Sequence, residues 1–416
     1  MVSTEAITKT HAKGYIAAWL GWAFDGLDST LFILIGLPFV TQLMGGDSVA
    51  AKGNASLIQA FFLFGWALGG AVFGRIGDKI GRSRTLMLTV LIYAAFTGLS
   101  SFATEWWHLL IFRFISALGI GGEWAAGSAL VSETFHAKHK AWASALLQTG
   151  YQVGMMLASL TLAVFPALLI RLGLVQHTVQ AYRWLFLVGV TPAILTLWIR
   201  RAVPEPEAWQ EARESEQLPR VRDLFAPAVL PTTLKALGLL SLALTAVWAF
   251  LYFNSLVIRS LSEVKSMAPA AADALIARFT VVWLVWNIVG NFVAGYLARS
   301  IGARWTFALF MGAAAVCGWV GFSHPLPLGP TMMWVNVTAF FALGIFGLFP
   351  LYVPPLFPTL LRTTGAGFCY NMGRVAAGIG TLVAGQVVGR LGVGVPIAYA
   401  SLLFIPAMIL AFFMPA

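Results

Sequence analysis

The sequence predicts an all-α membrane protein with twelve transmembrane helices, arranged as two related bundles of six. Composition gives the first indication. Of the 416 residues, 59% are hydrophobic and 10% are charged, whereas a soluble domain carries about 25% charged residues. Twelve apolar segments are each near or above the ~20 residues that a helix needs to cross a bilayer. Similar stretches also recur in the two halves of the chain, which predicts an internal repeat.

The apolar segments form two sets of six, separated by one long polar stretch. The first set covers residues 14–40, 56–76, 85–103, 106–132, 141–169 and 182–200, and the second covers 233–258, 275–298, 304–322, 330–356, 364–388 and 393–414. Only Thr104 and Glu105 separate the third segment from the fourth. The predicted domains are therefore an N-terminal bundle at residues 1–201, a linker at 202–231, and a C-terminal bundle at 232–416.

The polar stretch at residues 202–231 is rich in proline and glutamate. Glu207, Glu211 and Glu214 share one helical face, since residues three and four apart lie together on a helix. We predict a cytoplasmic linker that contains a short surface helix.

Lys and Arg concentrate in every second loop. The loop after the second segment holds Arg75, Lys79, Arg82 and Arg84, and the alternate loops hold fewer basic residues. The positive-inside rule then places both termini and the linker in the cytoplasm, in a multi-pass protein of the cell membrane (inner or plasma membrane). These loops account for the net charge of +10, so no nucleic-acid partner is predicted.

The two halves match at three places. Residues 22–29 correspond to 248–255, residues 74–81 to 295–302, and residues 140–150 to 362–373. A parallel repeat of six spans predicts two similar bundles with a site between them near the midplane of the membrane.

The loop after the second segment carries a motif that resembles the signature loop of the major facilitator superfamily, namely Gly74-x-x-x-Asp78-Lys79-x-Gly81-Arg82-x-Arg84. The resemblance implies the major facilitator fold. Arg113 resembles the second motif of the superfamily, although Ala117 stands where a glycine is usual. Glu133, followed by Lys140, resembles its acid-then-base pattern. By resemblance, a cytoplasmic gate of ion pairs would contain Gly74, Asp78, Lys79, Gly81, Arg82, Arg113 and Glu133, acting as gate and scaffold and not as substrate contacts.

Three further stretches narrow the resemblance. They are Asp25-Gly-Leu-Asp28, Gly121-Gly-Glu-Trp124, and the run from Phe357 to Arg374. They are similar to the organic-acid:proton symporters of the superfamily, which include a sialate/lactate group and an aromatic-acid group. The resemblance implies proton-coupled symport of a small organic anion, a carboxylate, by alternating access. Protons are then the coupling ion, and no other cofactor is expected.

Charged residues inside the apolar segments support a shared site. At 1.5 Å per residue, Asp25, Glu123 and Arg374 each lie about 14–15 Å from the predicted cytoplasmic end of their segment. Charges at that depth usually line a cavity or form pairs. We expect Arg374 to bind the anionic substrate, because its planar fork suits a carboxylate, and Asp25, Asp28 and Glu123 to couple protons. In the alternative, Arg374 only neutralises Glu123, and the acids are a structural polar pair.

Other polar residues in the segments are candidates for the wall of the substrate cavity. Each is also compatible with a hydrogen bond between packed helices. They are Gln148, Tyr151, Gln152, Asn254, Asn287, Tyr370 and Asn371.

Three classes of function remain open on the sequence. The first is a proton-coupled importer of an organic anion, and the second is a proton-driven exporter of drugs or metabolites with the same fold. The third is an integral membrane enzyme or receptor. Arg374 with three acids favours the first class. No nucleophile–base pair and no convincing metal-ligand set is present among the side chains, so we predict neither an enzyme nor a metal site. We expect a monomer whose partners are the substrate anion, protons and the lipid bilayer.

Overall fold

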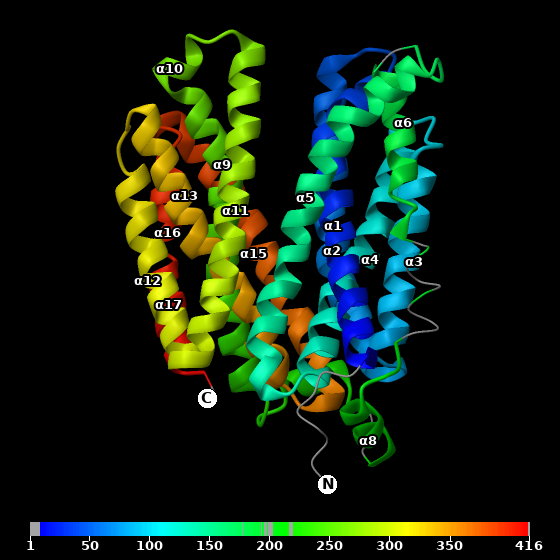
Figure 1. The fold of residues 1–416 in the computed structure, drawn as a ribbon, viewed down its shortest axis with the longest axis vertical. Helices are drawn as coiled ribbons and strands as arrows, with labels where there is room; N and C mark the ends of the chain where they lie inside the picture. Colours follow the sequence, from blue (N-terminus) through cyan, green and yellow to red (C-terminus); the bar gives the residue numbers. More distant parts are fainter. Residues whose placement is uncertain are drawn as a thin grey trace. The chain divides into compact units, whose positions relative to one another are not determined.

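The structure is a computed structural model that describes residues 9–176, 178–192, 194, 198, 203–215 and 219–414. Helices make up nearly all of these residues, and Figure 1 shows the long helices of each half of the chain running alongside one another. The first half of the chain contains α1 (Lys9–Leu43), α2 (Ser48–Ile80), α3 (Arg82–Ser100), α4 (Trp106–Thr134), α5 (Ala137–Arg171) and α6 (Thr178–Val188). A short helix, α8 (Glu207–Ser215), lies in the predicted linker, where we expected a surface helix.

The second half begins with the long helix α9 (Leu230–Ser260). The helices that follow are α10 (Ser262–Lys265), α11 (Pro269–Ile301), α12 (Ala303–Phe322), α13 (Leu328–Gly344), α14 (Phe349–Tyr352), α15 (Arg362–Leu391), α16 (Val395–Ser401) and α17 (Phe404–Phe412). The tenth predicted segment is not one uninterrupted α-helix, because 3-10 turns and α14 follow α13. Pro350 and Pro354 lie in this region, and proline lacks the N–H that an α-helix needs.

Ten stretches of helix within the described part of the chain are long and apolar enough to cross a membrane. They correspond to ten of the twelve predicted segments. The predicted segment 182–200 lies partly outside the described residues. The segment 364–388 lies within α15, which has 30 residues but is not among the ten, since Asn371, Arg374 and several glycines lower its mean hydropathy.

The chain groups into two compact units, and each includes the beginning of a helix from the other half of the sequence. The first unit contains Met1–His136, Leu147–Val221 and Phe357–Asn371, and the second contains Ala137–Leu146, Arg222–Leu356 and Met372–Ala416. The predicted domain boundaries, drawn along the sequence alone, stay a prediction.

In the first unit, α4 packs against α1, α2 and α3. The contact between α2 and α4 is close because glycines face the neighbouring backbone. A Cβ added at Gly121 would overlap the carbonyl oxygen of Trp66, and one added at Gly69 would overlap that of Leu118. Small residues at a helix interface permit this approach in membranes. The packing therefore brings the side chains of α4 close to the neighbouring helices.

In the second unit, α11 and α12 pack against α13, and α12 also packs against α16 and α17. The long helix α9 contacts α16 and α17 as well. Phe307, Phe310 and Phe349 are fully buried. Aromatic side chains thus make much of this core.

Candidate functional site

Two acids of the first unit meet where α1 packs on α4. Asp25 on α1 and Glu123 on α4 are 0% and 1% exposed, and their carboxyl groups interact with each other. The Glu123 carboxyl also lies against Gly21 of α1, one helical turn before Asp25. Asp25 and Glu123, which we expected to share a site, therefore lie next to each other in this unit.

A contact between two carboxyl groups has a chemical consequence. An ionised carboxylate only accepts hydrogen bonds, whereas a protonated one also donates. Two carboxyl groups can hydrogen-bond to each other only when at least one carries a proton. A shared proton is therefore the chemistry that a contact between Asp25 and Glu123 would support.

The third predicted proton-coupling acid, Asp28, has a different environment. Its Oδ1 accepts a hydrogen bond from Arg113 Nη1 at 2.9 Å and one from Thr97 Oγ1 at 2.8 Å. Thr97 in turn lies 3.1 Å from the hydroxyl of Ser116. Asp28 thus forms a buried ion pair with Arg113, and hydrogen bonds between charged groups are stronger than those between neutral ones.

The ion pair with Asp28 places Arg113 apart from the other predicted gate residues. We placed Arg113 in the cytoplasmic gate by motif resemblance, but the structure places it beside Asp28, toward the beginning of α4. The guanidinium is fully buried and lies over two aromatic rings, 4.9 Å from the centroid of Phe32 and 4.7 Å from that of Phe62. Aromatic faces attract a cation at this range, so these two rings stabilise the guanidinium together with Asp28.

The face of α5 that we proposed for the cavity wall lies along α1. The hydroxyl of Tyr151 is 3.1 Å from Ser29 Oγ, and its ring is 5.1 Å from that of Trp22. Gln148 and Gln152 are buried on the same face of α5. Their side-chain oxygens have no hydrogen-bond partner among the described residues. A buried amide oxygen is usually satisfied, so these two groups are free to accept a hydrogen bond from water or a ligand.

The beginning of α15 also belongs to this unit. The ring of Tyr370 stacks on that of Trp124 at 3.8 Å between centroids. Asn371 Nδ2 donates to the carbonyl oxygen of Gly367 at 2.8 Å, and more weakly to that of Gly121 at 3.4 Å. For Asn371 the structure therefore shows the helix-packing contact that we gave as the alternative to a ligand contact.

Three predicted site residues lie in the second unit. Asn254 donates to the carbonyl oxygens of Phe250 and Leu251 within its own helix. Asn287 is buried, and its Oδ1 has no hydrogen-bond partner in the part of the chain that is described. Arg374 is half-buried on α15, one turn after Tyr370. Its position relative to the acids of the first unit stays a prediction.

The predicted gate residues other than Arg113 lie together at the α2–α3 loop. Arg82 forms a bidentate pair with Glu133 at 2.7 and 2.8 Å, and Asp78 lies 3.2 Å from Arg82. Glu133 also accepts a hydrogen bond from Arg362 at 3.0 Å. Arg82, Asp78 and the Glu133 side chain are fully buried, so each charge depends on its partners. Lys79, by contrast, is exposed.

Asp78 also supplies the cap that α15 lacks. Its carboxylate accepts the backbone N–H groups of Thr363 and Thr364 at 3.1 and 2.8 Å, and the Thr364 hydroxyl at 2.6 Å. The first turn of α15 has no acid of its own. The N–H groups of a first helical turn are otherwise unsatisfied and attract negative charge. A residue of α2 therefore caps a helix whose Thr364 lies 286 positions further along the chain.

Residues of the linker form hydrogen bonds with the same loop. Trp209 Nε1 donates to the carbonyl oxygen of Asp78 at 3.0 Å. Glu205 accepts the backbone N–H groups of Ser83 and Arg84 at 3.1 and 3.0 Å, so it caps α3. Gly81, the residue just before α3, has φ +107° and lies against the Glu205 carboxyl. A side chain at Gly81 would meet both backbone strain and that carboxyl.

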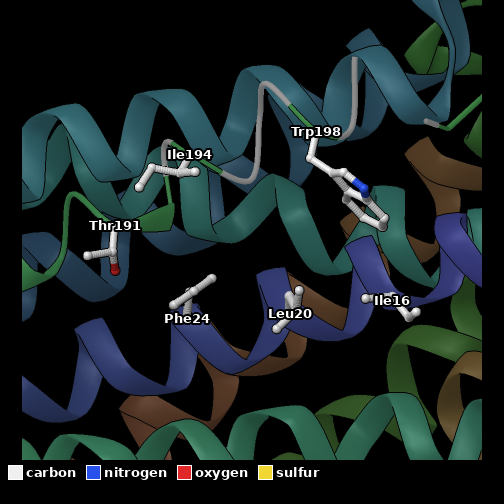
Figure 2. A pocket seen from close by; sticks show the side chains of 6 residues that line it. All are labelled: Ile16, Leu20, Phe24, Thr191, Ile194 and Trp198. Carbon is white, nitrogen blue, oxygen red and sulfur yellow. The ribbon is translucent and has the colours of Figure 1, made fainter. Parts of the chain in front are cut away.

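An open groove lies elsewhere in the first unit. Its volume is about 380 Å³, and Figure 2 shows three side chains of α1 facing three from the stretch after α6. The lining residues are Ile16, Leu20, Phe24, Thr191, Ile194 and Trp198. Because none of them is charged, the groove does not have the chemistry that binds a carboxylate.

Several residues of this arrangement were missed by sequence reasoning. Thr97 and Ser116 complete the environment of Asp28, and Trp124 stacks on Tyr370. Thr97 and Ser116 resemble the many other small polar residues of membrane helices. Only the neighbouring helix reveals what they contact. Trp124 had a signal, since it follows Glu123 in a motif that we had already noted.

Comparison with known proteins identifies the family. The model of the Major Facilitator Superfamily matches residues 18–364. The chain belongs to this superfamily. It is therefore a multi-pass membrane transporter and not an enzyme.

Relatives in the superfamily are similar over most of their length. A probable 4-methylmuconolactone transporter of Cupriavidus pinatubonensis is 31% identical over 91% of this chain and 82% of its own. The sialic acid transporter NanX of Escherichia coli is 27% identical over 97% and 94%. Among solved structures, the proton:xylose symporter XylE has a TM-score of 0.76 at 16% identity, covering 98% of this chain and 96% of its own. That structural likeness shows the major facilitator fold.

Proposed function

We propose that this protein is a proton-coupled symporter of a small organic anion that works by alternating access. The observation that carries the proposal is the contact between the carboxyl groups of Asp25 and Glu123, two acids that lie inside membrane-spanning helices. Membrane-embedded acids of this kind often serve proton pathways in transporters. The names of similar proteins support an organic acid as substrate, since they include transporters of sialic acid, cis,cis-muconate and niacin.

We further propose roles for the remaining predicted residues. Arg374 would bind the carboxylate of the substrate, and Gln148, Tyr151 and Gln152 would line the path beside the acids. Asp78, Arg82 and Glu133 would form a cytoplasmic gate, with both termini in the cytoplasm of a cell whose inner or plasma membrane holds the protein.

Transport in proteoliposomes tests the proposal. Radiolabelled sialic acid, cis,cis-muconate and niacin are offered to wild type, Asp25→Asn and Glu123→Gln, and both uphill uptake and counterflow are measured. We expect each variant to lose uphill uptake driven by a proton gradient and to keep counterflow, because exchange of loaded carriers needs no net proton movement. Glu263→Gln, which changes an exposed acid between α9 and α11, is the control and should keep both.

The same assay separates symport from proton-driven export. A symporter accumulates the labelled acid on the side toward which protons flow, and an exporter drives it in the opposite direction. Accumulation against the proton flow would replace the symport proposal with the exporter. Intact uphill uptake in both acid variants would remove the carboxyl pair from the mechanism.

A further inference from the structure

The contact between Glu123 and α1 depends on a position that has no side chain. A Cβ built at Gly21 would overlap Glu123 Oε1 and lie 2.8 Å from Glu123 Cδ. Real Cβ atoms almost never approach another atom so closely. The Glu123 carboxyl therefore occupies space on the surface of α1 that only glycine leaves open.

This space lies next to Asp25. Gly21 and Asp25 are four residues apart on one helix, so they lie on the same face, one turn from each other. The acid from α4 rests on Gly21, and its carboxyl group reaches Asp25. Any residue with a side chain at position 21 would push the Glu123 carboxyl away from this position.

We propose that Gly21 is a positioning residue for the proton site, and that its missing side chain allows Glu123 and Asp25 to share one proton. This inference rests on the proposed function, in which that carboxyl pair couples transport to protons. Gly21 does not itself bind the proton or the substrate. It acts through the place that it leaves for Glu123.

The other ionisable groups around the pair do not replace this arrangement. Asp28 is held by Arg113 at 2.9 Å. Tyr93, on α3, is fully buried and influences Asp25, Asp28 and Glu123 electrostatically. Tyrosine loses its proton only near pH 10 in water. The shared proton is therefore left to the two acids.

Gly21→Ala is a clean way to disturb the pair. The added methyl group meets the far end of a flexible glutamate side chain and not a neighbouring backbone, so the side chain moves while the helices stay in contact. Alanine is also a better helix former than glycine. Gly127→Ala is the matched control, because it adds a methyl group at the same α1–α4 interface, at an ordinary distance of 3.5 Å from Ala18 Cβ.

Infrared difference spectroscopy of the purified full-length protein, recorded across a pH change, reads the shared proton without any substrate. The carboxylic C=O band of the pair is assigned by its loss in Asp25→Asn and in Glu123→Gln. We expect Gly21→Ala to shift this band, because the two groups no longer hydrogen-bond, and Gly127→Ala to leave it in place. An unshifted band in Gly21→Ala, or an equal shift in both glycine variants, would overturn the inference.

A compensating substitution adds a second readout. Glu123→Asp shortens the acid and makes room for the methyl group, so Gly21→Ala/Glu123→Asp should move the band back toward the wild-type position. Strictly additive shifts would contradict a role that acts through Glu123. In proteoliposomes, Gly21→Ala should lower uphill accumulation about tenfold while keeping counterflow, since a 1 Å misplacement of a reacting group costs up to about 100-fold.

The two proposals fail in distinguishable ways. If Asp25→Asn and Glu123→Gln keep uphill uptake, the proposed function fails whatever the infrared bands show. If those variants lose uphill uptake but Gly21→Ala behaves like Gly127→Ala in both assays, only the role of Gly21 is wrong.

Discussion

At the scale of single residues, the two acids of α1 differ in what their removal leaves behind. Asp28→Asn leaves the guanidinium of Arg113 buried at 0% exposure without its carboxylate. Breaking a buried ion pair on one side typically costs about 3–5 kcal/mol, so we expect a loss of this order from the stability of the protein. Asp25, in contrast, interacts with another acid, Glu123, so Asp25→Asn should cost less. Thermal unfolding of both variants in the same detergent measures the difference.

A double variant tests whether the loss of stability comes from the unpaired charge of Arg113. Asp28→Asn combined with Arg113→Met removes both charges, and should recover much of the stability lost in Asp28→Asn alone. Equal thermal stability of Asp28→Asn and Asp25→Asn would mean that the pair with Arg113 contributes little.

The sequence predicted only part of this residue-scale picture. Counting the rise along each helix placed Asp25 and Glu123 at one depth, because that rise is the same in every α-helix. The same count does not say which way a side chain points. The motif resemblance grouped Arg113 with the gate residues, whereas its guanidinium pairs with Asp28. Gly21 gave no signal, since its importance lies in the atoms of α4 that come close to it.

At the scale of elements, the cap on α15 comes from a different helix. Asp78→Asn keeps one side-chain oxygen but removes the negative charge beside the first N–H groups of α15 and beside Arg82. A charge at a helix N-terminus contributes roughly 0.3–1 kcal/mol, and up to ~2 kcal/mol when partly buried. We expect slower counterflow and little change in substrate affinity. Counterflow rates and equilibrium binding, measured on the same preparation, check this; a large loss of affinity at a normal exchange rate would contradict it.

A second element-scale prediction concerns the cap on α3. Burial raises the pKa of the half-buried Glu205 above its usual value, although hydrogen bonds from Arg84 and Ser83 oppose the shift. An acid whose pKa is higher in the folded state binds protons more tightly when folded, so its contribution to stability falls as pH rises above the unfolded pKa of about 4.3. Wild type should therefore lose stability relative to Glu205→Gln across that window. Unfolding of both proteins at a series of pH values measures the difference, and a gap that widens in favour of wild type would have the wrong sign.

Elements were more predictable than residues, with two exceptions. Long apolar runs located the helices because a bilayer requires about 20 such residues, and the glutamate spacing located α8. The interruptions after α13 and between α16 and α17 were missed, since both stretches are continuously apolar. The contacts of Glu205 and Trp209 with the α2–α3 loop join stretches more than 100 positions apart, and no local pattern predicts such contacts.

At the scale of the whole molecule, the repeat and the packing divide the chain differently. The sequence relates residues 140–150 to 362–373, as equivalent parts of two halves. In the structure, Ala137–Leu146 groups with the unit that is built mainly from the second half, and Phe357–Asn371 with the unit built mainly from the first half. In the second unit a Cβ at Gly295 would lie 3.0–3.1 Å from Ala145 and Ala141, and in the first a Cβ at Gly74 would lie 2.8 Å from the Thr363 carbonyl oxygen. Gly295 and Gly74, which match in the repeat, thus each pack against the beginning of a helix from the other half of the chain. A domain boundary drawn along the sequence does not show this exchange.

The last prediction concerns substrate and proton together. If the protein is a symporter, anion binding and protonation of the acids favour each other, because linkage between two sites is reciprocal. The substrate acid identified by the uptake screen should therefore bind more tightly at lower pH. Arg374→Lys should weaken binding by roughly 1.5–3 kcal/mol, the range for a hydrogen bond to a charged group, since lysine cannot form the bidentate contact of arginine.

Calorimetry of wild type and Arg374→Lys tests both expectations. It is carried out between about pH 5.5 and 8, a range that lies above the pKa of a free carboxyl group. Arg299→Lys, at an exposed position near the end of α11, is the matched control and should bind as wild type does. Binding that does not tighten on acidification would argue against symport and favour the exporter. Unchanged affinity in Arg374→Lys with normal pH dependence would keep the symporter but move its anion site to another residue.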